Sequence, residues 1–258
     1  MMRCANPPGN RALVFSLVRC CGGAVIALTA LSSAALAQPS RHSTDLSSAI
    51  DLHDDYTKSG PTITNTLVLR GDYAPEPWIA LRLELPLAYV DTPNVRPVMG
   101  FGDIYTRATA RIVASDLSLL AGTDLVVDSA ASPVLGGGKN VVGPFATLAW
   151  DIAPGAWLRT QVQHHASIGG DPHRPTVRTT SVRPTALVAL PDGYWFLVDQ
   201  KFQVYHDGRR NLTYAAVLEG GMEVAPDVSV YIDPGVQIDS PWALTWMVTG
   251  GVRWGLPR

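Results

Sequence analysis

The sequence predicts an all-β protein, specifically an up-and-down antiparallel transmembrane β-barrel of twelve strands. Three observations lead to this class. Apolar and polar residues alternate along stretches of about ten residues. Short turns alternate with longer polar connections. Finally, no stretch after residue 37 is long and apolar enough for a membrane-spanning helix. The 258 residues, of which 47% are hydrophobic and 16% charged, are enough for one large domain.

Residues 1–37 read as a secretory signal peptide that is removed, which leaves residues 38–258 for the barrel. Arg3, Arg11 and Arg19 give a positive leader without acidic residues, and an apolar run follows them. The run ends in "ALAQ", a small-residue cleavage signal that places the cut after Ala37. An uncleaved N-terminal anchor is the alternative interpretation.

The exported part of the chain has no cysteine and a modest negative charge. All three cysteines lie in the leader, so disulfides cannot stabilise the mature fold. Without the three leader arginines, 17 basic residues stand against 22 acidic ones, a balance of −5 with His neutral. This balance excludes a nucleic-acid-binding footprint. We therefore expect the chain to lie in the cell outer membrane, with its lipid and the outer-membrane assembly machinery as partners.

Tight turns recur along the chain at 72–78, 113–117, 152–157, 190–195 and 224–228, where Pro, Gly and Asp fix the backbone. Longer polar connections separate them, at 91–102, 129–140, 167–175, 206–211 and 237–241. This alternation is typical of outer-membrane barrels, which have short periplasmic turns and longer external loops.

The stretches between these connections are the predicted strands, and most of them alternate with period two. In chain order they are 46–55, 62–73, 78–90, 103–113, 117–128, 142–151, 156–166, 176–190, 195–206, 212–224, 228–237 and 242–256. In 78–90, for example, Leu81, Leu83 and Leu85 share one face, and Arg82 and Glu84 share the other. Bacterial barrels have even strand numbers, so 46–55 is needed as the twelfth strand. If 46–55 is instead a periplasmic helix or tail, the fallback is ten strands.

Five tryptophans lie close to the predicted short turns or the C-terminus: Trp78, Trp150, Trp157, Trp195 and Trp254. Because Trp is enriched at membrane interfaces, we expect these residues at the periplasmic rim. Trp78, Trp157 and Trp195 have the parity of the polar face, so some of them could plug the barrel mouth instead.

Charged residues of both signs share the predicted inward face. The candidates for lining the lumen are Arg82, Glu84, Arg107, Arg111, Asp124, Arg159, Arg183, Asp199, Lys201, Glu219, Glu223, Asp233 and Arg253. They must share one face because Arg or Lys in lipid near the midplane costs about 2–4 kcal/mol. Two interpretations remain open, a polar passage for solutes and a salt-bridged interior that merely fills the barrel.

Catalysis and metal binding find little support. His165 and Ser167 form a His-x-Ser pair similar to the "H-x-S-N-G" of outer-membrane lipid hydrolases, but Ile168 replaces the asparagine. Their parity also turns both residues inward, away from lipid. The six histidines show no metal-binding spacing. The sequence predicts no enzyme, no metal and no cofactor.

The stretch 83–112 is an alternating strand, a polar loop, and then Gly100, Gly102 and Asp103 as a Gly-x-Gly-Asp that opens the next strand. It resembles the bacterial outer-membrane β-barrel proteins named for the MetA pathway of phenol degradation. The resemblance is confined to this hairpin and implies an outer-membrane channel or transporter, sometimes for hydrophobic or aromatic compounds. From the residues themselves, the glycines would allow a tight backbone reversal and Asp103 would accept turn N–H groups.

Three functions follow as hypotheses. The first is a barrel that passes a small solute, possibly hydrophobic or aromatic. The second is a lipid hydrolase that uses His165 and Ser167. The third is a structural barrel with a plugged lumen.

Overall fold

The structure, a computed structural model, describes residues 43–44, 46–206, 212–239 and 243–257. The predicted leader 1–37 lies outside the described residues, as do most of the predicted connection 206–211 and part of 237–241. No helix among the described residues is long and apolar enough to cross a membrane.

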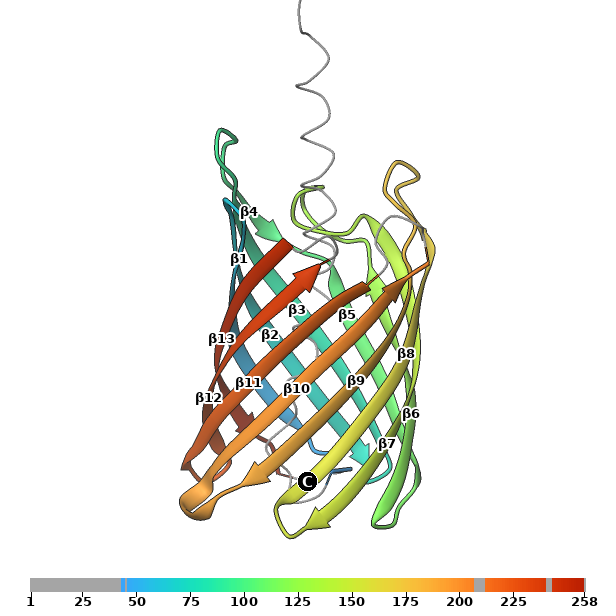
Figure 1. Ribbon diagram of the computed structural model, residues 1–258, viewed down its shortest axis with the longest axis vertical. Helices are drawn as coiled ribbons and strands as arrows, with labels where there is room; N and C mark the ends of the chain where they lie inside the picture. The colour runs from blue at the N-terminus through green and yellow to red at the C-terminus, as the bar shows by residue number, and fades with distance from the viewer. Residues whose placement is uncertain (1–42, 45, 207–211, 240–242, 258) are drawn as a thin grey trace, which may run out of the picture.

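The described residues form thirteen strands (Figure 1). They are β1 (Ala49–Ser59), β2 (Thr62–Glu76), β3 (Ile79–Asp91), β4 (Val98–Phe101), β5 (Ile104–Val113), β6 (Leu117–Val127), β7 (Lys139–Ala153), β8 (Ala156–Gly170), β9 (Arg178–Ala189), β10 (Tyr194–Tyr205), β11 (Leu212–Ala225), β12 (Val228–Asp239) and β13 (Ala243–Gly255). A 3₁₀ turn, Pro191–Gly193, directly precedes β10.

The sheet closes on itself as an antiparallel barrel of twelve strand positions, which confirms the predicted fold class. Strands that follow one another in the sequence pair, except β4 and β5, and β1 pairs with both β2 and β13. β4 and β5 share one position because both pair with β3. β4 pairs with its C-terminal half and β5 with its N-terminal half. The break between them falls at Gly102 and Asp103, where Gly102 N–H still donates to Pro86 O at 3.0 Å.

Alternation along each strand separates a buried inner face from an exposed apolar outer face. In β7 the exposed residues include Leu148 and Trp150, whereas Phe145, Thr147 and Ala149 are buried. Apolar side chains therefore cover the outside of the barrel, which is the pattern of barrels that face lipid. Figure 1 shows the longer loops, with the short turn between β1 and β2, at its upper end, and the other short turns together at its lower end.

The first predicted strand, 46–55, is shifted in the structure. β1 begins at Ala49 and runs on to Ser59. Residues 46–48 precede it, and Ser48 holds the end of the barrel by accepting Ala74 N–H at 3.0 Å on its hydroxyl oxygen and Leu256 N–H at 2.9 Å on its carbonyl. Leu46 therefore belongs to a segment that precedes the strand. Its alternation with its neighbours has the same period of two as a strand, so the sequence pattern does not distinguish the two.

The five predicted interfacial tryptophans divide between the two faces. Trp150 and Trp254 are exposed within strands, and Trp78 is exposed in the turn between β2 and β3, as interfacial residues would be. Trp157 and Trp195 are only 2% and 1% exposed and lie inside the barrel, packed in a cluster with Leu187, Leu197 and Tyr231. The positions of these two tryptophans agree with the alternative that they plug the barrel mouth. They contradict the prediction that these side chains face lipid.

The inward position of Trp195 gives a testable prediction at Gly221, its cross-strand partner on β11. A Cβ atom at Gly221 would lie 2.1 Å from Trp195 Cζ2, so Gly221→Ala forces a large ring to move. We expect a loss of about 1–3 kcal/mol in the free energy of unfolding, measured by urea titration in lipid vesicles. Gly71→Ala is the matched control, since a Cβ there meets nothing within 4 Å. Equal stability of the two variants would contradict the packing.

Candidate functional site: the lumen

Twelve of the thirteen charged candidates are withdrawn from solvent on the inner face, and one is not. Glu84, Asp124, Asp199, Lys201, Glu219, Asp233 and Arg253 are buried, and Arg82, Arg107, Arg111, Arg159 and Arg183 are half-buried. Glu223 is exposed near the C-terminal end of β11. It lies next to the turn before β10, since a Cβ added to Gly193 would be 3.1 Å from the Glu223 Cβ. A solute-sorting role for these residues remains a prediction.

Three of the arginines form ion pairs with aspartates on adjacent strands. Arg82 Nε donates to Asp72 Oδ1 at 2.7 Å between β3 and β2. Arg107 on β5 donates two hydrogen bonds, of 2.7 and 2.9 Å, to the two carboxylate oxygens of Asp124 on β6. Arg183 Nε donates to Asp199 at 2.8 Å between β9 and β10. These forked, charge-assisted pairs fix the three guanidinium groups against the barrel wall.

Arg159 on β8 differs from those three arginines. Its guanidinium carbon lies 5.3 Å from the centre of the Trp157 ring, a cation–π contact. It makes no ion pair or hydrogen bond with any residue in the part of the chain that the structure describes. Its side chain is thus the one lumen arginine of this group without a carboxylate partner there.

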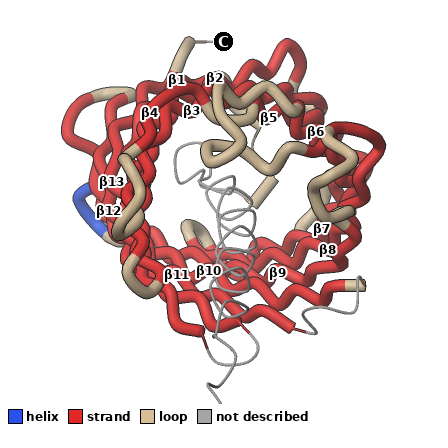
Figure 2. Tube along the Cα trace, turned by 90° about the horizontal axis from the view of Figure 1, so that it is seen from above, coloured by secondary structure: helices blue, strands red, loops and turns tan. Residues whose placement is uncertain are grey.

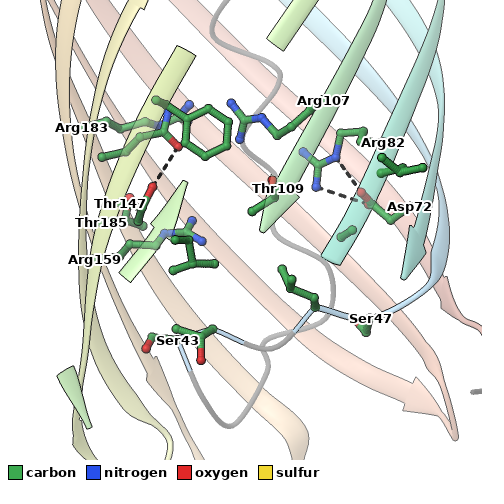
Figure 3. A pocket seen from close by; sticks show the side chains of 17 residues that line it. Ser43, Ser47, Asp72, Arg82, Arg107, Thr109, Thr147, Arg159, Arg183 and Thr185 are labelled. Atoms are coloured by element: carbon green, nitrogen blue, oxygen red, sulfur yellow. Dashed lines mark hydrogen bonds and ion pairs between the residues drawn. The ribbon is translucent and has the colours of Figure 1, made fainter. Parts of the chain in front are cut away.

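The four arginines line one cavity inside the barrel, of about 100 Å³ (Figure 3). Its lining also includes one carboxylate together with hydroxyl, amide and apolar groups: Asp72, Ser43, Thr44, Leu46, Ser47, Ala80, Leu81, Thr109, Leu120, Phe145, Thr147, Gln161 and Thr185. Such a volume holds several waters or part of a small organic molecule. The cavity therefore offers cationic, hydrogen-bonding and apolar contacts together.

The segment before β1 forms part of this cavity wall. Ser43 and Thr44 are buried, and Ser43 N–H donates to Asp151 Oδ1 on β7 at 2.7 Å. Figure 3 shows Ser43 and Ser47 below the arginines, at the lower side of the cavity. The polar pattern of these serines gave no sequence signal for a position inside the barrel.

A second polar cluster joins the first strand to the last, and sequence reasoning missed most of it. Asp51 on β1 accepts Arg253 Nε at 2.9 Å and the Tyr231 hydroxyl at 3.0 Å. His53 Nδ1 lies 2.5 Å from the same carboxylate. Of these residues, the sequence predicts only Arg253 as a lumen candidate. The inward parity of Asp51 and His53 is the signal that points to the other two. We call Asp51, His53, Tyr231 and Arg253 the seam cluster.

The Gly-x-Gly-Asp stretch holds the connection between β6 and β7 against the outer mouth. The Asp103 carboxylate accepts the backbone N–H groups of Ser129 and Ala130 at 3.1 Å and of Gly137 at 2.6 Å. Leu135 of this connection is buried against Ala88 and Val90, on the inner face of β3. Figure 2 shows loop segments beside β5 and β6 that extend over the opening.

The two glycines of that stretch allow the β6–β7 connection to pack closely against the backbone. Neither has a positive φ, so the backbone conformation does not itself require glycine there, and the tight reversal stays a prediction. A Cβ on Gly102 would lie 3.1 Å from the Leu135 carbonyl oxygen, and one on Gly100 would lie 3.1 Å from Leu135 Cδ1. Asp103 accepts N–H groups as expected, but from a distant loop and not from its own turn.

Removing the Asp103 carboxylate should release this loop. Asp103→Ala leaves three backbone N–H donors without their acceptor, and bonds to a charged acceptor contribute about 1.5–3 kcal/mol each. We expect trypsin to cleave after Lys139, which is now buried as the first residue of β7, at least about 10-fold faster, because cleavage follows the open population. Asp128→Ala, in the same connection but exposed, is the control. Unchanged cleavage in Asp103→Ala would contradict the anchoring role.

The geometry does not assemble the hydrolase pair. His165 Nε2 lies 3.8 Å from Asp124 Oδ2, and Asp124 is already held by Arg107. The Ser167 hydroxyl oxygen instead accepts Val177 N–H at 2.7 Å, and no hydrogen bond joins Ser167 to His165 among the described residues. The same residues contain no group of three or more His, Cys, Asp or Glu that could hold a metal ion.

A closed twelve-stranded barrel with an apolar outer face and a charged lumen has the fold of outer-membrane β-barrel proteins. Comparison with solved structures places it beside channels of that class. An outer membrane channel from Pseudomonas putida F1 matches with a TM-score of 0.69 at 10% identity, over 86% of this chain and all of that one. The NanC porin matches with 0.62 at 12% identity, over 80% and 100%.

The CymD monoaromatic hydrocarbon channel matches with a TM-score of 0.51 at 7% identity, over 83% of this chain and 90% of that one. No protein-family model and no curated protein matches the sequence. Because all three identities are low, the comparisons show the shared fold, and the resemblance to the phenol-degradation family stays a hypothesis.

Proposed function

We propose that the protein is an outer-membrane channel or transporter that passes a small solute with an apolar or aromatic body. The observation that carries this proposal is the cavity inside the lumen, with Leu46, Leu120 and Phe145 beside arginine and threonine side chains. Small-molecule sites combine apolar walls with a few polar groups that orient the ligand. Twelve strands lie between the eight that side chains fill and the sixteen that leave an open pore.

Several further observations support the proposal. The fold is shared with channels, one of which is named for monoaromatic hydrocarbons. The exposed apolar band supports insertion in the outer membrane, and the leader 1–37 would supply export. In this proposal the inward charged residues sort solutes by charge and the Asp103-anchored loop narrows the outer entrance.

A plugged structural barrel is the second candidate, and a specific observation favours it. Ser43 and Thr44 are buried within the lumen wall, and Trp157 and Trp195 add bulk at the turn end. A barrel closed at that end would have no continuous path for a solute.

Single-channel recording in planar bilayers separates the two candidates, with liposome uptake of a small aromatic compound as a second readout. We expect a small, steady conductance and uptake above that of protein-free liposomes. A refolded barrel that gives neither conductance nor uptake would remove the channel and leave the plugged barrel. Lipid release by the wild type that Ser167→Ala abolishes would instead support the hydrolase.

A further inference from the structure

The cavity has an excess of positive charge that its own carboxylates do not balance. Four arginines, from β3, β5, β8 and β9, face it. Asp72, Asp124 and Asp199 each hold one of them, and no carboxylate in the described part of the chain lies within ion-pair distance of the Arg159 guanidinium. Figure 3 shows Arg159 projecting toward the cavity beneath Thr147 and Thr185.

An uncompensated guanidinium in a narrow lumen is an anion site. Withdrawing an ion from bulk water is costly unless an opposite charge or several hydrogen bonds replace the lost hydration. The nearby carboxylate that could compete, Asp199, already holds Arg183 and accepts the Thr185 hydroxyl at 3.2 Å. The planar guanidinium matches a carboxylate because two parallel N–H groups meet its two oxygens.

The rest of the cavity fits an organic body attached to that carboxylate. Phe145 lines the wall with its ring 4.7 Å from the Arg107 guanidinium carbon, so one arginine already lies over this ring. Leu120 and Ala80 add apolar surface. Thr109 and Gln161 supply hydrogen-bonding groups at the same wall. A purely inorganic anion would use Arg159 but none of the apolar surface.

We propose that Arg159 binds the carboxylate of a small organic acid whose apolar or aromatic body lies against Phe145 and Leu120. This inference deepens the proposed channel function and rests on it for its biological sense. Binding itself does not need transport. Trp157, which lies under the Arg159 guanidinium, acts as the platform that holds the side chain in the cavity.

The test measures binding of benzoate to the full-length refolded barrel in detergent micelles by isothermal titration calorimetry. Benzyl alcohol serves as the uncharged probe of similar shape, and chloride and inorganic phosphate serve as ions without an apolar body. We expect benzoate to bind at least about 10-fold more tightly than benzyl alcohol and than either inorganic ion, since hydrogen bonds to charged groups contribute about 1.5–3 kcal/mol. Equal binding of benzyl alcohol, tighter binding of an inorganic ion, or no binding of benzoate would overturn the proposal.

Two variants assign the binding to Arg159. Arg159→Gln should weaken benzoate at least about 10-fold, and Arg159→Lys should retain part of the affinity through its charge. Removing an unpaired cation leaves no carboxylate orphaned, so both variants should fold, which circular dichroism checks. Arg111→Gln is the control, because Arg111 also faces inward on β5 but does not line the cavity. Wild-type benzoate affinity in Arg159→Gln would overturn the assignment.

The two proposals can fail separately. Benzoate binding that depends on Arg159, without conductance or uptake, would keep the anion site and remove the channel. Conductance without such binding would keep the channel and remove the site.

Discussion

Asp51→Ala should lower the free energy of unfolding by about 3–5 kcal/mol, the cost of leaving a buried charge without its partner. Asp51 and Arg253 face each other across β1 and β13, the strands that close the barrel. Both residues are only 1% exposed. Without the carboxylate, the Arg253 guanidinium loses its ion pair and the Tyr231 hydroxyl loses its acceptor.

Urea titration of the variant in lipid vesicles, followed by tryptophan fluorescence, gives the measurement. Asp54→Ala is the matched control on the same strand: Asp54 is exposed and accepts one hydrogen bond, from Asn65 at 2.9 Å. An exposed polar pair contributes about 0–1 kcal/mol, so the control should remain close to wild type. Asp51→Asn should lie between the two, because the amide oxygen can still accept from Arg253. If Asp51→Ala unfolds at the wild-type urea concentration, the seam cluster does not hold the barrel closed.

The seam cluster illustrates which part of the fold the sequence could predict. Period two and turn residues located all twelve strand positions, because both signals are local. Contacts between β1 and β13 join residues about 200 positions apart, as Asp51 and Arg253 are. No local pattern specifies which inward residues of the first and last strands meet, since that depends on the register of every intervening pair.

The same limit applies to the lumen. Parity predicts that Arg159 and Arg183 both face the lumen, and it does not distinguish between them. Asp199 separates them, because it lies opposite Thr185 in the register and reaches diagonally to Arg183. Asp72 was overlooked, although it lies directly opposite Arg82, because the alternation of 62–73 is less clean. Ion-pair assignment therefore required the register, whereas membership of the inner face did not.

Trp157 and Trp195 show how composition and parity can disagree. Proximity to short turns favoured the membrane interface, but parity favoured the interior, and the structure follows parity. The reason is geometric, since successive side chains of a strand must point to opposite faces. Gly221 opposite Trp195 accommodates the ring on the inner face. A large aromatic residue opposite an inward glycine is thus a better indicator of a filled lumen than its distance from a turn.

Leu83→Arg should cost about 2–4 kcal/mol of unfolding free energy, if the outer face of β3 meets the middle of the bilayer. Leu83 is exposed and lies halfway along the strand between the exposed aromatic residues Trp78 and Tyr89. Aromatic residues mark the two interfaces of a barrel, and a tilted strand crosses between them in about ten residues. Leu83 therefore lies near the bilayer midplane, where an arginine cannot keep its hydration.

The same substitution at Leu117 is the control for depth. Leu117 is equally apolar and exposed, but it is the first residue of β6, directly after a short turn. Near the interface an arginine costs about 0–1 kcal/mol, because its side chain reaches the headgroup region. Urea titration of both variants in vesicles measures the difference. Equal costs at Leu83 and Leu117 would mean that depth has no effect, and the exposed apolar face would then need a protein partner in place of lipid.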